Sequence, residues 1–503
     1  MKGDIVNSTK LLTYPQVNPS DYDNNGYIKD SKILKIIEDH QEFINKFNTN
    51  LDFYIGKNKR ITQQIDTTAP DNEINIPYAR TLTHTIKGYM FKPETIIYSI
   101  EDEENQEYFD NLMEIYKINK EPLKNSELGE DQSKYGIAFE ILYAKLNGDT
   151  TIPYFVVVKP QEIIPIYDYT IEKNIVACIR YYDIETDDTK TKQKVEVYYT
   201  DRIINYYLKV TEIKNNELLT TLELIGETEN MFQDIPINIY CNNQEYMADY
   251  EPIQALIQLL DKLMSDSANE LDRFAAAYLV MKEYILGGNV EESENKLERL
   301  KKLRIFEIGK DGDIQFLTKD IPVAFFQEIK NTIKEDIQKH SFIPDFMDQS
   351  FGTASGIAIR YKLIGLENLC ADKEALFRVG LERRIQLINN FLKIQKYTID
   401  ISNINIKFYR NLPESLTEEI TNFKMVDPDG GMLSKKTALS LLSFIKNSQE
   451  EIDKINEDME TRKANQPEVD LDNLPEETND MINSQAENNQ VENLKQQPSN
   501  EVE

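Results

Sequence analysis

The sequence has few of the residues that hold small secreted domains together. Its three cysteines, Cys178, Cys241 and Cys370, lie far apart in the chain, which fits neither a disulfide framework nor a cluster of zinc ligands. A reducing compartment is therefore expected. Glycine is also scarce, with 18 in 503 residues, and this excludes a collagen-like chain.

Long apolar runs are absent. The longest, Phe274–Met281, is far shorter than the roughly 20 residues that span a bilayer. The N-terminus, residues 1–12, lacks a basic segment followed by an apolar one. We therefore expect a soluble protein without a secretory signal and without a membrane partner.

Motifs for nucleotide and hydrolase chemistry are also missing. The sequence has neither a G-x-x-x-x-G-K-[ST] phosphate loop nor an H-E-x-x-H zinc motif, and its three histidines, His40, His84 and His340, are far apart. Ser355 stands fourth in the segment 352–356, whereas a nucleophile elbow places its serine third. We interpret Ser355 as a helix N-cap, and we expect no enzyme active site and no cofactor.

One segment partly matches a calcium loop. Asp21–Ile28 agrees with the first eight positions of an EF-hand loop. The twelfth position, which should carry a bidentate glutamate, is Lys32, and a cation there would repel Ca²⁺. We favour a turn rich in Asp and Asn before a helix over calcium binding, and we expect no metal site.

Basic residues are strongly outnumbered. The 57 Lys and Arg face 87 Asp and Glu, for a formal net charge of -30, so the chain as a whole repels phosphate and anionic lipid. This argues against a conventional DNA-binding protein. Within 465–503 there are ten acidic residues, one lysine and no aromatic residue, a composition that predicts a disordered tail.

One segment reverses this charge balance. Residues 355–397 hold eight Lys or Arg and four acidic residues, on a pattern that predicts one long helix. We favour a solvated face that pairs with the acidic surface of a neighbouring copy, and direct contact with nucleic-acid phosphates is the alternative. Arg378, Arg383 and Arg384 are the candidate DNA or inter-subunit contacts.

Length and periodicity predict an α+β protein of several parts, because 503 residues and 58.6 kDa exceed one typical domain. The expected helices are 32–47 (capped by Asp30 or Ser31), 252–282, 323–341, 355–396, 416–423 and 434–459. The expected strands are an antiparallel meander of the runs 155–158, 163–167, 175–182, 195–199 and 203–208, a hairpin of 305–308 with 314–317, and a strand pair within 399–409.

In this order of parts the chain resembles the portal proteins of tailed bacteriophages, in particular the family of long-tailed phages of Gram-positive bacteria. The segments that carry the resemblance are Ile235–Asn243, Val158–Asp168, Ser355–Leu363, Gly430–Thr437, Asn75–Arg80 and Gly88–Pro93. The resemblance covers roughly residues 33–459, and it depends on the collinear order of these segments rather than on a single motif.

The resemblance implies a ring of about twelve subunits at one capsid vertex, with a central channel through which double-stranded DNA is packaged and ejected. Its implied partners are the terminase, the head-completion adaptor, and the major capsid and scaffolding proteins. The protein would be part of the virion and would assemble in the host cytoplasm, with ATP hydrolysis left to the terminase. Another elongated virion or scaffold protein without a DNA channel is the alternative, and the missing motifs disfavour a hydrolase.

The resemblance also implies a division of the chain into the parts of a portal subunit. These are an N-terminal arm (1–30), a β-rich wing (31–250 with the long helix and strand 355–411), a first stem helix (251–282), a clip (283–322), a second stem helix (323–342), a tunnel loop (343–354), a helical crown (412–462) and an acidic tail (463–503).

Two sets of residues follow as candidate sites from this likeness. The tunnel loop would narrow the channel with apolar bulk between a helix-breaking proline and a flexible glycine, and its residues are Pro344, Phe346, Met347, Asp348, Phe351 and Gly352. A plain helix–helix connection is the alternative. The clip would meet partner proteins through Glu291, Lys301, Lys302, Asp311 and Asp313. An acidic channel would let DNA slide, because phosphates find few fixed cations there.

Overall fold

The computed structural model describes most of the chain outside several loops and both ends. The described residues are 13–58, 71–100, 105–148, 150–185, 191–213, 217–275, 278–282, 313–317, 323–346, 356–394, 403–411, 433–440, 442, 445 and 448–464. They form a mixed helix and sheet protein whose strands pair antiparallel, which confirms the expected α+β class. The chain divides into two compact units, Met1–Asn411 and Leu412–Glu503.

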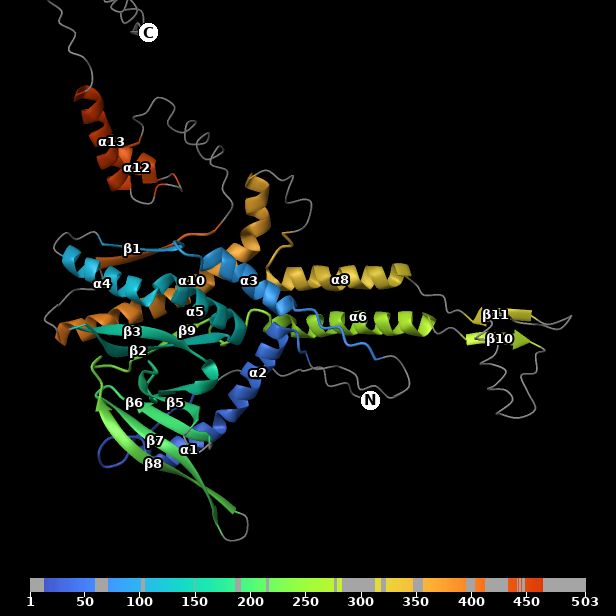
Figure 1. Ribbon diagram of the computed structural model, residues 1–503, viewed down its shortest axis with the longest axis horizontal. Helices are drawn as coiled ribbons and strands as arrows, with labels where there is room; N and C mark the ends of the chain where they lie inside the picture. The colour runs from blue at the N-terminus through green and yellow to red at the C-terminus, as the bar shows by residue number, and fades with distance from the viewer. Residues whose placement is uncertain are drawn as a thin grey trace, which may run out of the picture. The chain divides into compact units, whose positions relative to one another are not determined.

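The first unit contains most of the described helices (Figure 1). They are α1 (Asp30–Asp39), α2 (Gln41–Ile55), α3 (Tyr78–Met90), α4 (Gln106–Asn119), α5 (Glu121–Tyr135), α6 (Gln254–Ala275), α8 (Val323–Ser341) and α10 (Gly356–Ile394), with short 3₁₀ turns η1 (Pro19–Asp21), η3 (Pro160–Glu162) and η4 (Glu251–Ile253).

The described strands of the same unit form four sheets. The strands are β1 (Ile96–Ile100), β2 (Ile137–Asn147), β3 (Thr150–Val158), β4 (Ile163–Tyr167), β5 (Ile175–Glu185), β6 (Thr191–Tyr198), β7 (Arg202–Ile213), β8 (Glu217–Glu229), β9 (Ile237–Cys241), β10 (Tyr278–Lys282), β11 (Asp313–Leu317) and β12 (Ile404–Phe408).

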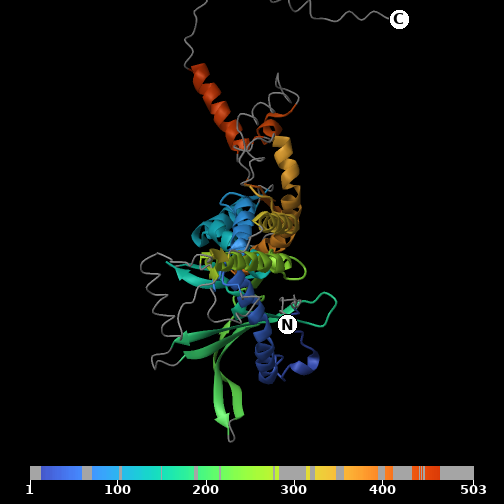
Figure 2. The same cartoon turned by 90° about the vertical axis from the view of Figure 1, so that its right-hand side faces the viewer.

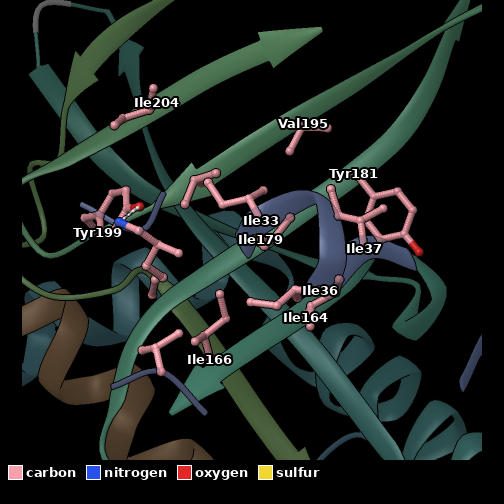
Figure 3. Packing of buried hydrophobic residues seen from close by; sticks show 14 residues of the cluster. Ile33, Ile36, Ile37, Ile164, Ile166, Ile179, Tyr181, Val195, Tyr199 and Ile204 are labelled. Atoms are coloured by element: carbon pink, nitrogen blue, oxygen red, sulfur yellow. Dashed lines mark hydrogen bonds between the residues drawn. The ribbon is translucent and has the colours of Figure 1, made fainter. Parts of the chain in front are cut away.

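The predicted meander is confirmed as the five-stranded sheet β4-β5-β6-β7-β8, in which neighbours in sequence pair antiparallel. The exception is the run 155–158, which lies in β3 and belongs to the separate sheet β3-β2-β9. Helix α1 covers one face of the meander, as Figure 3 shows: Ile33, Ile36 and Ile37 pack on inward residues of the sheet such as Ile164 and Ile179. The apolar residues of α1 recur at helical spacing and those of the strands alternate, so both sets point into the same core.

The single helix expected over 32–47 is wrong, because α1 ends at Asp39 and α2 begins at Gln41. The break is at His40, which is 1% exposed and whose Nδ1 lies 2.8 Å from the hydroxyl of Tyr181 on β5. The expected N-cap is also wrong: Lys29 precedes α1, and Asp30 is its first residue. Periodicity continues across the break because Ile44 of α2 packs against the same core cluster as the buried isoleucines of α1.

Helix α10 packs against β9 of the three-stranded sheet. The contact is close at Gly380, where an added Cβ would lie 2.4 Å from the ring of Tyr240. Only glycine therefore allows this approach. The expected helix 355–396 is confirmed over the described residues, where α10 spans Gly356–Ile394. Ser355, its expected N-cap, and residues 395–396 lie outside the described residues.

Helices α6 and α8 lie side by side, and both lead to the strand pair β10–β11 (Figures 1 and 2). The bounds expected for α8 are confirmed. The helix expected over 252–282 is wrong in its last part, since α6 ends at Ala275 and Tyr278–Lys282 is a strand paired with β11. A short apolar run is compatible with either a strand or a helix, and here the pairing with β11 makes it a strand. The other expected hairpin partner, 305–308, lies outside the described residues.

The strand pair expected within 399–409 is corrected, for the described part of that segment, to one strand, β12, whose partner is the distant strand β1. In the second unit, the helix expected over 434–459 is two helices, α12 (Lys435–Ser440) and α13 (Ser448–Ala464). The expected helix 416–423 and the tail 465–503 lie outside the described residues.

The buried His40 predicts a pH dependence of stability. Burial lowers its pKa from 6.5 to about 4, so the unfolded chain binds a proton there at a higher pH than the folded chain does. Above pH 6.5, His40 is neutral in both the folded and the unfolded chain and costs no stability. As the pH falls from 6.5 towards 4, only the unfolded chain takes up this proton, which lowers the free energy of unfolding by about 3 kcal/mol over the whole window. Urea midpoints measured from pH 7 to pH 4.5 should fall more steeply for the wild type than for His40→Gln. Parallel pH profiles of the two proteins would contradict this linkage.

Candidate functional site

The most deeply buried cation of the basic helix α10, Arg384, forms its contacts within the same subunit. Arg384 is 0% exposed, and its guanidinium donates to both carboxylate oxygens of Glu140 on β2, with Nη2–Oε2 at 2.5 Å. Its Nη1 donates to Asn125 Oδ1 at 2.8 Å. The expectation that Arg384 contacts DNA or a neighbouring subunit is therefore wrong. A cation on a mostly apolar helix face is buried together with that face.

A second carboxylate lies close to the same cation. Glu121 at the start of α5 is 3.6 Å from Arg384 and accepts a hydrogen bond from the hydroxyl of Tyr98 at 2.6 Å. Burial raises the pKa of Glu121, and Arg384 opposes that rise. The guanidinium carbon lies 4.5 Å from the centroid of the Phe155 ring. Arg384 thus joins α10, α5 and the sheet β3-β2-β9.

A second buried cation on α10 holds the segment that leads into α6. Lys373 is 1% exposed and its Nζ lies 2.8 Å from Asp249 Oδ2. Asn242 accepts from the same ammonium group and donates to Asp249 Oδ1 at 2.8 Å. Ser133 of α5 donates to the other carboxylate oxygen of Asp249. Because Asp249 precedes η4 and α6 by only a few residues, this cluster fixes where α6 starts relative to α10.

The two remaining candidate arginines of α10 are partly exposed. Arg378 pairs with Glu374 at 2.8 Å and donates to the carbonyl oxygen of Ile406, while 33% of its side chain remains exposed. Arg383 pairs with Asp234 at 2.6 Å and is 27% exposed. Both have partners within the chain, and a role for them in DNA or subunit contact stays a prediction.

The end of the first unit is fastened by a C-terminal clamp, which we define as residues Tyr409, Arg410 and Asn411. Arg410 forms ion pairs with Glu367 at 3.0 Å and Glu374 at 2.9 Å, both on α10. The backbone amide of Tyr409 donates to Thr95 O, and that of Asn411 donates to Tyr89 O. The clamp therefore holds the chain immediately before the second unit begins at Leu412.

Two of the expected tunnel-loop residues are described. Pro344 and Phe346 follow α8 after Phe342, which has a positive φ of 60° and lies near Gly365 of α10. Phe346 is 45% exposed. The other four, Met347, Asp348, Phe351 and Gly352, lie outside the described residues.

The expected clip residues are mostly outside the described part of the chain. Asp313 is the first residue of β11, in register with Lys282 at the end of β10. Glu291, Lys301, Lys302 and Asp311 lie outside it. Their role in partner binding stays a prediction.

The segment that partly matches a calcium loop is a structural turn. Asp23 Oδ1 accepts the backbone amides of Asn25 and Tyr27, both at 2.9 Å, and Lys32 pairs with Asp21 at 3.3 Å. Among the described residues, no group of His, Cys, Asp and Glu is arranged to hold a metal ion. None of the helices in the described part of the chain is long and apolar enough to cross a membrane.

The sequence alone did not identify the carboxylates, Glu140 and Asp249, that pair with the buried cations Arg384 and Lys373. Glu140 interrupts the apolar strand run Ile137–Leu142, and it is 0% exposed. A single charge inside such a run is a usable signal, because burial there requires a charged partner. Asp249 gives no comparable signal, since its segment is polar and looks like an exposed loop.

Comparison with known proteins gives a match over most of the chain. A family model described as "Phage portal protein, SPP1 Gp6-like" matches residues 33–465. The chain is 24% identical to the portal protein of Clostridium phage phiCD119 over 341 residues, which cover 65% of this chain and 73% of the relative. It is also 24% identical to the portal protein of Bacillus phage SPP1 over 331 residues, or 61% of each chain. It thus spans less than two thirds of the SPP1 protein.

The burial of Arg384 predicts a large effect of its replacement on stability. Arg384→Met leaves Glu140 buried without its cation, which should destabilise the protein by roughly 3–5 kcal/mol. Arg383→Met is the matched control: it removes the neighbouring, partly exposed arginine and should cost about 1 kcal/mol or less. The double variant Arg384→Met/Glu140→Leu should recover much of the loss. Thermal unfolding measures all three, and equal effects of the two single variants would contradict the assignment.

Proposed function

Because the chain belongs to the SPP1 Gp6-like family of phage portal proteins, we propose that about twelve copies form a ring at one capsid vertex. Double-stranded DNA is packaged and ejected through the central channel of this ring. The observation that carries the proposal is the family match over residues 33–465. The family is structural, implies a ring oligomer at the capsid of the virion, and is not catalytic.

The parts of the proposed subunit follow the order of the described elements. The other three sheets with α1–α5 and α10 form the wing, α6 and α8 form the stem, and the segment with β10 and β11 forms the clip. The second unit, up to residue 462, forms the crown. The pairing of α6 with α8, and of the two strands next to them, supports this assignment.

The clip is the proposed docking site for the terminase during packaging and for the head-completion adaptor afterwards. Its candidate contact residues are Glu291, Lys301, Lys302, Asp311 and Asp313. The wing meets the major capsid and scaffolding proteins while the particle assembles in the host cytoplasm. A clip at the end of two paired helices is well placed for this purpose, since its described strands β10 and β11 pair with each other and with no strand of the wing.

The charge distribution supports a channel through which DNA slides. The net charge is -30, and the two buried cations of α10, Lys373 and Arg384, are paired within the subunit. Fixed cations that bind phosphates would hold DNA by releasing its counterions. Because Lys373 and Arg384 are buried in ion pairs inside the subunit, they are not available to bind DNA phosphates in the channel.

Ring formation is the first test of this function. In native mass spectrometry, purified protein should give particles with about twelve times the 58.6 kDa mass of one chain. Negative-stain images should show rings with a central hole. If the protein is instead another virion structural protein without a channel, its assemblies should have no hole. A stable monomer at micromolar concentration would contradict both functions.

The tunnel loop gives the second test. Replacing Phe346, Met347 and Asp348 with glycine should leave rings and procapsids normal, because in the proposed ring the subunits meet through their helices and not through this loop. DNA per particle should fall several-fold, since the apolar constriction is lost. Ile171→Gly, at a loop residue that is 100% exposed, is the control and should package normally. Full heads at wild-type yield in the triple variant would exclude gating by this loop.

A further inference from the structure

One edge of the five-stranded meander is covered by a preceding segment of the chain. Residues 15–17 run parallel to β4, at the edge of the sheet. The amide of Val17 donates to Tyr167 O at 2.9 Å, and the amide of Tyr167 donates to Pro15 O at 3.0 Å. Tyr14, which is buried, anchors this segment against the ring of Tyr167. The β4 edge is therefore not open to a further strand at this point.

The opposite edge of the meander, β8, is open. It pairs with β7 along its length, and among the described strands none pairs with its other side. Edge strands are usually protected by short length, lysine or proline, but β8 is 13 residues long and has four glutamates and no lysine, arginine or proline. Leu219 and Leu224 are 48% and 57% exposed. An open edge of this kind accepts a further strand.

The part of β8 that is regular enough to pair ends at Leu224. Tyr206 of β7 pairs with Leu224, and Asn205 pairs with Gly226, so Ile225 lies in a bulge without a partner. A bulge disrupts pairing on its strand. The available edge is therefore the stretch up to Leu224.

The sequence that precedes residues 15–17 complements this stretch position by position. We call residues 6–11 the arm segment; it ends just before Thr13, where the described chain begins. Laid parallel to 219–224, it matches at every position except Thr9, which lies beside Leu222. The matching pairs are Val6 with Leu219, Asn7 with Thr220, Ser8 with Thr221, Lys10 with Glu223 and Leu11 with Leu224.

We propose that the arm segment of one subunit adds a sixth strand to the meander of a neighbouring subunit, parallel to β8 and in this register. Main-chain hydrogen bonds hold the added strand, and the ion pair of Lys10 with Glu223 fixes its register. The side chain of Glu223 is 60% exposed, and its contact with Lys209 is long at 3.8 Å, so it can accept a second cation. A shift by two residues in either direction places Lys10 beside Thr221 or Ile225 instead.

Strand direction favours this exchange. Successive strands of the meander are antiparallel, so β4 and β8 run in the same direction. Residues 15–17 are parallel to β4. When two subunits place these edges side by side, the chain runs past the neighbour's β8 and then along its own β4 without reversing.

Chain length excludes the same subunit as the acceptor. There the arm segment and residues 15–17 would lie on opposite sides of the five strands, six strand spacings or about 29 Å apart. From Leu11 to Pro15 the chain spans at most about 14 Å. A head-to-tail ring uses two different surfaces of each subunit, and the open β8 edge and the arm segment are such a pair. The number of copies rests on the proposed function, whereas the exchange needs only a second copy.

A disulfide between paired positions tests the exchange on the purified full-length protein. Ser8→Cys/Thr221→Cys places two cysteines side by side if the arm segment lies beside the neighbour's β8. After mild oxidation, a non-reducing gel should show a ladder of linked subunits that continues to the full ring. Asn7→Cys/Thr221→Cys is the matched control, because adjacent side chains point to opposite faces of a sheet, and its ladder should be at least tenfold weaker. The single-cysteine variants measure the background from the native cysteines.

The outcomes separate the exchange from the proposed function. Rings without a ladder would overturn the exchange and leave the portal assignment intact. A disulfide within one chain would also overturn it, since the arm segment would then lie on its own β8. A ladder that closes at a number far from twelve would support the exchange and contradict the proposed ring. A monomer without a ladder would contradict both.

Charge reversal tests the register independently, with the same cysteine pair as the readout. Lys10→Glu places two carboxylates side by side and should lower the yield of the ladder several-fold. Adding Glu223→Lys restores the ion pair and should restore the yield. Lys2→Glu makes the same change of charge outside the arm segment and should leave the yield unchanged. Equal losses in Lys10→Glu and Lys2→Glu, or no recovery in the double variant, would sink this register.

Discussion

A buried cation has to be met by an anion, and α10 carries two such cations. Removing Lys373 and Arg384 from water costs several kcal/mol each unless a carboxylate and further hydrogen bonds compensate for it. Asp249 and Glu140 do so from elements that lie far away in the sequence. The long helix can therefore pack in one axial position only, and the start of α6 is fixed with it. The two parts of the first unit, its sheets and its paired helices, are joined through these contacts.

The fold was predictable where a single element determines its own form. The bounds of α8 and most of α10 follow from apolar spacing, because a long amphipathic helix needs no partner to be recognised. Prediction failed where a partner decides the outcome. Tyr278–Lys282 is a strand because β11 pairs with it, and β12 pairs with β1, which lies far away in the sequence. No local pattern reports such partners.

The candidate site was predictable to a smaller extent. Counting charges identified α10 as unusually basic, but a count does not separate an arginine on the surface from one in the core. Arg384 and Arg383 are neighbours in sequence, and one is fully buried while the other is partly exposed. The distinction comes from Gly380, which brings this stretch of helix against Tyr240 and the sheet. Collinearity with a family was the stronger signal, since it depends on the order of many segments.

The C-terminal clamp has a mechanical consequence. Tension on the chain beyond Asn411 would pull on the end of β12, where Phe408 is paired with Ile96. The chain before Ile96 leads back to α3, so force and anchor lie at the same end of this strand pair. That arrangement would let the pairs peel apart one after another. The ion pairs of Arg410 and the backbone bonds of Tyr409 and Asn411 lie between the pulled end and the first pair, so they must break before peeling can begin.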